Sequence, residues 1–173
     1  MGRVIKYEGS ELDTATTRKL EAFARGEMTW AEVEGMTFEE ARAIAQVGCD
    51  LAGAGRYEEA RVLFEGLVEG NPKDAASRAA LGTVYQKLGR LQEALHEYGA
   101  ALERDPGNPV ALVNRGELYL RQGNRQGFTD IATAVEADPH GETSAGRRAR
   151  ALVKAIALAA VEKLKEGPER ARA

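Results

Sequence analysis

The sequence predicts an all-α protein: three consecutive helical hairpins, with a helical extension before them and a capping helix after them. Three observations favour this class. They are self-similarity at a period of 34 residues, glycine and proline columns at fixed places in each period, and a composition rich in small residues. Aromatic residues make up 6% of the 173 residues, whereas 19 residues are glycine. Helices that pack closely through small side chains therefore fit this chain better than a large aromatic core.

Charge and cysteine content exclude several functional classes. Lys and Arg number 24 against 27 Asp and Glu, so the net charge is −3, and a nucleic-acid-binding protein would usually carry a basic excess. A single cysteine, Cys49, excludes an internal disulfide framework and fits a reducing compartment. The N-terminus lacks the apolar core of a signal peptide, and the apolar run 155–161 is far shorter than the roughly 20 residues of a membrane helix. We expect a cytoplasmic protein without membrane insertion.

Residues 1–38 precede the repeats and are expected to form a helical extension. An amphipathic helix is predicted over 11–25. Thr29 and Thr37 are each followed three residues later by a glutamate, which is the pattern of a capping box. Two roles remain open for this extension: covering the exposed start of the array, or pairing with a second copy to form a homodimer. The candidate dimer surface consists of Leu12, Leu20, Phe23 and Trp30.

The predicted repeat region, 39–141, divides into blocks 41–74, 75–108 and 109–141. One glycine column is predicted to end the first helix of each block, where a positive φ closes the last turn at low cost. Proline stops the second helix. A second glycine column lies inside the first helix, where it costs about 1 kcal/mol relative to alanine and therefore implies close packing against small residues of the second helix. The column that ends the first helix consists of Gly55, Gly89 and Gly123, and the proline column of Pro72, Pro106 and Pro139. The column inside the first helix consists of Gly48, Gly82 and Gly116, and its expected packing partners are Ala60, Ala94 and Gly127.

The third block departs from the other two. It is one residue shorter after Gly123, and it carries Gly127 where the others carry alanine. These departures predict a looser third turn.

The middle block resembles a known helix–turn–helix unit. Its run Leu81-Gly82, Tyr85, Gly89, Ala94, Tyr98, Ala101, Asp105-Pro106 is similar to the tetratricopeptide repeat (TPR), although Ile44 and Arg78 occupy a position where that family often has tryptophan. The resemblance implies a three-repeat TPR solenoid whose first helices line a concave groove that binds extended peptides. The residues carried over to that groove are Arg42, Ala45, Cys49, Ala52, Ala76, Ala79, Thr83, Gln86, Lys87, Val110, Val113, Glu117, Leu120 and Arg121.

The whole layout resembles the class II chaperones of bacterial type III secretion systems. That resemblance implies a protein or peptide client, specifically a secreted translocator-type protein whose unfolded, amphipathic segment is held in the groove. An alternative function from a different class is a TPR scaffold or adaptor that joins folded partners in a bacterial assembly or signalling complex.

Residues 142–173 are predicted to form a capping helix and tail. An apolar stripe would cover the last repeat, and Gly167-Pro168 would end the helix. The stripe consists of Ala151, Leu152, Ala155, Ile156, Ala159, Ala160 and Leu164. A second interpretation makes this helix a basic contact for an acidic partner, through Arg147, Arg148, Arg150 and Lys154.

The sequence shows no catalytic constellation, and we expect neither an enzyme nor a bound cofactor or metal. His96 and His140 lie far apart and are expected on the surface. Gly53-Ala54-Gly55 imitates the start of a dinucleotide fingerprint, but it follows a predicted helix and has no third glycine.

Overall fold

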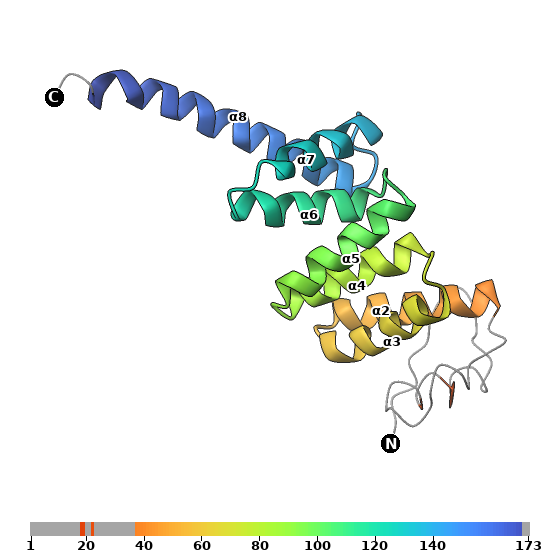
Figure 1. Cartoon of the computed structure of the whole chain (residues 1–173). Coiled ribbons are helices and arrows are strands. Elements are labelled where there is room, and N and C mark those ends of the chain that lie inside the picture. The colour runs from red at the N-terminus through yellow and green to blue at the C-terminus, as the bar shows by residue number, and fades with distance from the viewer. Residues whose placement is uncertain (1–17, 20–21, 23–36, 171–173) are drawn as a thin grey trace. The chain divides into compact units, whose positions relative to one another are not determined.

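The computed structural model of the chain describes residues 18–19, 22 and 37–170, with side chains as far as Lys163. Within these ranges every regular element is an α-helix, as the sequence predicts (Figure 1). The chain divides into two compact units, Met1–Glu97 and Tyr98–Ala173. The helices are α2 (Phe38–Gly53), α3 (Tyr57–Gly70), α4 (Ala75–Lys87), α5 (Leu91–Arg104), α6 (Pro109–Arg121), α7 (Gln126–Ala137) and α8 (Ser144–Arg170).

Short polar side chains cap the first helices. Thr37 begins α2 with the predicted capping box, because its hydroxyl accepts the N–H of Glu40 while the Glu40 carboxylate accepts the N–H of Thr37. The Asp74 carboxylate caps α4 by accepting the N–H of Ala76, and the Asn108 side-chain oxygen caps α6 by accepting the N–H of Ala111. The box predicted at Thr29 and the proposed dimer surface, Leu12, Leu20, Phe23 and Trp30, lie outside the described residues.

The three turns within the hairpins are equivalent. Gly55, Gly89 and Gly123 have φ of 78°, 76° and 72°, which confirms that this column requires glycine. In each turn the next backbone N–H donates to the carbonyl five residues earlier, at 2.9 Å in the first two turns and 2.8 Å in the third. The prediction of a looser third turn is therefore wrong, because the missing residue falls after this hydrogen-bonded turn.

In unit 1, α3 packs against both α2 and α4. Its buried face contains Ala60, Leu63, Phe64 and Leu67. A Cβ added to Gly48 would lie 2.8 Å from the Phe64 ring, so this glycine makes room for a large side chain of the second helix rather than for Ala60. The same holds in unit 2, where a Cβ on Gly116 would lie 2.9 Å from Ile131 Cδ1. The inner glycine column thus allows a bulky residue to fill the hairpin.

In unit 2, α6 and α7 approach each other more closely than alanine allows. A Cβ on Gly127 would lie 2.6 Å from the carbonyl oxygen of Gly116 and 2.9 Å from the amide nitrogen of Leu120. In the first two hairpins the equivalent residues, Ala60 and Ala94, are completely buried and carry their methyl groups without such conflict. The departure at Gly127 marks a tighter hairpin.

Helix α8 contacts α7 and α6 through its first turns. Gly146 and Ala149 are buried there, whereas Leu152 and Ile156 are half-buried and the alanines of the predicted stripe are exposed. The helix continues to Arg170, so Gly167 and Pro168 do not end it. A proline removes one backbone hydrogen bond of a helix, and here the helix runs on without that bond.

Candidate functional site

Each unit carries part of the predicted binding surface on its first helices, and unit 1 contains nine of the predicted residues. On α2, Arg42 and Cys49 are exposed, while Ala45 and Ala52 are half-buried. On α4, Ala76 and Lys87 are exposed, and Thr83 and Gln86 are half-buried. All eight side chains are thus at least partly accessible to solvent.

Two predicted residues are not available to a ligand. Ala79 is 2% exposed and Val113 is 1% exposed, so a bound peptide could reach neither without repacking the protein. Each belongs to a first helix that packs against helices on two sides: α4 against α2 and α3, and α6 against α7 and α8. The repeat pattern predicts the face of the helix but not how far the neighbours wrap around it.

In unit 2 the candidate face is more polar, and two of its residues already make contacts within the unit. Val110 is 41% exposed and Arg121 is exposed. The Leu120 side chain lies against the backbone of Gly127, so it also packs the hairpin. The guanidinium of Arg148 on α8 donates to the carboxylate of Glu117, with Nε to Oε1 at 2.7 Å, and forms an ion pair with it. A ligand at Glu117 would therefore compete with an intramolecular ion pair.

Most of the basic residues predicted on α8 as a partner contact form hydrogen bonds within the chain. Arg148 also donates to Asn114 Oδ1 at 2.8 Å. Arg147 donates to the carbonyl of Glu142 at 2.8 Å, and Arg150 donates to the carbonyl of Pro139. Three of the four predicted residues thus link α8 to the loop after α7 and to α6. All four residues are exposed, so the basic contact for an acidic partner stays a prediction, although such a partner would compete with these intramolecular hydrogen bonds at the three arginines.

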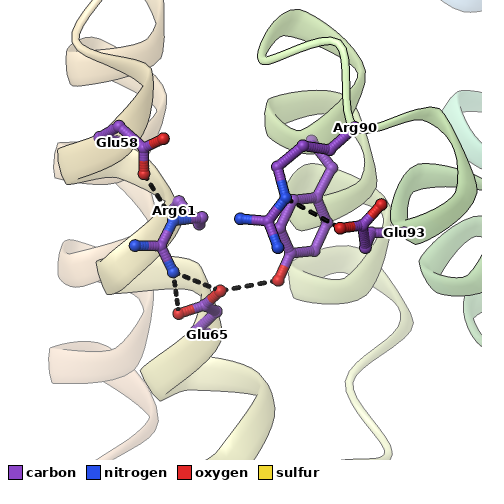
Figure 2. Close-up of polar contacts among 6 residues, drawn as sticks. Glu58, Arg61, Glu65, Arg90 and Glu93 are labelled. Carbon is purple, nitrogen blue, oxygen red and sulfur yellow. Dashed lines mark hydrogen bonds and ion pairs between the residues drawn. The ribbon is translucent and has the colours of Figure 1, made fainter.

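A polar network joins the two hairpins of unit 1 (Figure 2). The Tyr85 hydroxyl of α4 donates to Glu65 of α3 at 2.7 Å, and Glu65 also holds Arg61. The Arg90 guanidinium stacks on the Tyr85 ring, 4.6 Å from its centroid, and pairs with Glu93. Burial, followed by the hydrogen bond to Glu65, raises the pKa of Tyr85 to about 12. The hydroxyl therefore stays protonated at neutral pH and links α3 to α4 as a donor.

Sequence reasoning missed two ion pairs between the first and second helices of a hairpin. Arg78 pairs with Glu97 at 2.9 Å, with side-chain exposures of 16% and 12%. Arg115 pairs with Asp130 through both oxygens at 2.8 and 2.9 Å, and Asp130 is almost fully buried. The hydrogen bond to Asp130 raises the pKa of Arg115. The available signal was an arginine at a usually apolar position of the first helix together with an acidic residue in the corresponding column of the second.

The described side chains offer little reactive chemistry. Cys49 is exposed as a residue, but partial burial of its sulfur, with a smaller effect from the charge of Asp50, raises the pKa of the thiol, which keeps it protonated and weakly nucleophilic at neutral pH. Across residues 18–19, 22 and 37–163, no group of three or more His, Cys, Asp and Glu side chains could hold a metal ion. In the same part of the chain, no helix has the length and apolarity needed to cross a bilayer.

The repeat pattern and the hairpin geometry agree with a known family. The family model of the tetratricopeptide repeat matches residues 48–109 and 79–142, more than half of the chain. This chain belongs to the tetratricopeptide repeat family. A sequence relative, the mouse protein "Tetratricopeptide repeat protein 14", is 42% identical over 60 residues, which cover 34% of this chain and 8% of the relative. The chain thus spans less than a tenth of that relative.

Solved structures place this TPR protein's fold beside bacterial secretion chaperones. PcrH from Pseudomonas aeruginosa superposes with a TM-score of 0.64 at 22% identity, covering 72% of this chain and 97% of PcrH. The Yersinia enterocolitica type III secretion chaperone SycD, in complex with a peptide of the translocator YopD, superposes with a TM-score of 0.62 at 20% identity, covering 72% and 98%. At these identities the likeness establishes a shared fold.

Proposed function

We propose that this TPR protein is a non-catalytic, cytoplasmic chaperone that holds an extended segment of a secreted translocator-type client on its first-helix faces. The observation that carries the proposal is the fold it shares, over 72% of its length, with a secretion chaperone bound to a translocator peptide. That protein's ligand is the kind of client that we propose for this chain.

The accessible first-helix residues support this proposal chemically. Ala45, Ala52 and Ala76 are small and partly open, so they can accept a backbone and form shallow apolar pockets. An apolar anchor buried there contributes about 1.5–3 kcal/mol. Ordering the client costs several kcal/mol, so two or three anchors give roughly micromolar affinity. Such affinity suits a client that has to be released again.

Co-expression tests the proposal. The client is a translocator-type protein from the source organism, and the measurement is the soluble fraction of that client. Cys49→Glu on α2 and Val110→Glu on α6 place a charge at exposed first-helix positions, and we expect each to return the client to the pellet. Ala132→Glu adds the same charge at an exposed position of α7 and should leave the client soluble. A client that stays soluble with both first-helix variants would contradict the proposal.

A scaffold that joins folded partners is the second candidate, favoured by a sequence relative that is a TPR protein of another kind. This function predicts 1:1 binding of an already folded protein, with no effect on the solubility of an unfolded segment. Limited proteolysis of the bound partner distinguishes the two: a held segment is cleaved readily once released, whereas a folded partner resists cleavage in both states.

A further inference from the structure

Helix α8 carries apolar surface that no other part of the described chain covers. Arg147, Arg148 and Arg150, near its start, donate side-chain hydrogen bonds to the rest of unit 2. Beyond them the helix runs past α6 and α7 (Figure 1). From 155 to 161 it has seven consecutive apolar residues, among them Leu158 at 57% and Val161 at 47% exposure. A helix that is apolar on all sides is normally buried.

The open face lies opposite the docked one. At 100° per residue, Leu158 is about 180° around the helix from Ala149, which is completely buried. The face centred on Leu158 is therefore uncovered by the described residues while α8 remains docked to α6 and α7. We call it the outer face of α8; it consists of Ala151, Lys154, Ala155, Leu158, Val161 and Glu162, all exposed.

The charges on the outer face are self-complementary. Lys154 and Glu162 lie four residues before and four residues after Leu158. From 151 to 163 the only other charged residue is Lys163, so the segment carries nearly no net charge. An anionic lipid surface or an acidic partner would require a markedly basic face. Arg147, Arg148 and Arg150, near the start of α8, donate hydrogen bonds within unit 2.

We propose that the outer face of α8 pairs with the same face of a second copy, antiparallel, about a two-fold axis at Leu158. In this register Lys154 of each copy lies level with Glu162 of the other, and the two Leu158 side chains meet on the axis. Ala151 and Ala155 are small enough to let the two helices approach closely. A parallel pair would instead set each lysine beside the same lysine. The antiparallel contact is isologous and closes as a dimer.

Sedimentation velocity of the full chain over a concentration range up to about 100 µM tests the proposal. We expect a reversible dimer. Leu158→Glu should leave only monomer, with unchanged circular dichroism because the residue is exposed. Lys154→Glu and Glu162→Lys each replace two attractive contacts per dimer by repulsive ones, and each should weaken dimerisation about tenfold. The double swap Lys154→Glu/Glu162→Lys should restore it, as should mixing the two single variants.

Disulfide crosslinking tests the proposed register of the two α8 helices. In a Cys49→Ser background, Leu158→Cys should form a disulfide-linked dimer under mild oxidation, while Val153→Cys, exposed on a different side of α8, should not. A chain that is monomeric throughout the range overturns the proposal. So does a dimer that survives Leu158→Glu, or one that the double swap fails to restore, since another surface would then hold it.

Discussion

Gly127→Ala is a substitution on which helix propensity and tertiary packing give opposite predictions. The other two repeats carry alanine in this column, and alanine is favoured over glycine in a helix by up to about 1 kcal/mol. The structure predicts the opposite sign. The new Cβ would lie 2.6 Å from the Gly116 carbonyl oxygen and 2.9 Å from the Leu120 amide nitrogen. Both are backbone atoms, so no side-chain rotation relieves the contact.

The size of the stability loss follows from how far α6 and α7 have to separate. To accept the methyl group, α6 and α7 have to separate by several tenths of an ångström, which loosens the packing between them. Overpacking of this kind costs about 1–3 kcal/mol, and the helix-propensity gain offsets part of it. We expect a net loss of about 1–2 kcal/mol and, for a chain of this length, a melting temperature about 2–8 °C lower.

Thermal and urea unfolding followed by circular dichroism measure the change, with hydrogen exchange in α6 and α7 to locate it. Gly99→Ala is the matched control, because Gly99 lies inside α5 and a Cβ there meets nothing within 4 Å. That variant should gain up to about 1 kcal/mol. If Gly127→Ala unfolds at or above the temperature of the unmodified chain, the close approach of α6 and α7 is refuted.

Three further predictions concern the polar contacts. Arg115→Met should cost about 2–4 kcal/mol in urea unfolding, because it leaves the buried Asp130 carboxylate without its guanidinium, and Arg115→Met/Asp130→Leu should recover most of that loss. Tyr85→Phe should cost about 0.5–1.5 kcal/mol, since Glu65 loses one hydrogen bond but keeps Arg61; a larger loss would mean that the ring itself had moved. The backbone N–H and hydroxyl of Thr143 and the N–H of Glu142 hold the pKa of Asp138 at about 2, below its ordinary 3.8, so its stabilising effect is present above pH 3.8 and is lost as the pH falls toward 2. Thermal melts of Asp138→Asn should therefore differ from those of the unmodified chain at pH 7 and converge with them near pH 2; a difference independent of pH would exclude this carboxylate as the cause.

Much of the fold was predictable because the residues that recur in each repeat are required by local backbone geometry. A glycine that recurs every 34 residues indicates a positive φ, and Gly55, Gly89 and Gly123 all have one. Thr37 and Glu40 are close in sequence, so their capping box depends on little beyond the helix that it begins. Such features are set by backbone geometry within a few residues.

The candidate surface was less predictable, because accessibility depends on helices that are distant in sequence. The repeat columns place Ala79 and Val113 with the exposed first-helix residues, yet neighbouring helices bury both. The charge count of α8 suggests a basic surface, yet Arg147, Arg148 and Arg150, although exposed, donate hydrogen bonds to the loop after α7 and to α6. Neither the periodicity nor the composition of the sequence shows which hydrogen-bond partner a long side chain reaches.

The sequence by itself determined the helical class, the three-hairpin register and the family, since each follows from periodic spacing and turn chemistry. Only the tertiary structure decided how closely the hairpins pack and which faces remain open. Gly127 shows the difference. In sequence it is a departure that predicts a loose turn, whereas in the structure two backbones meet there too closely for a methyl group. Packing distance is a property of both helices together, and neither helix encodes it alone.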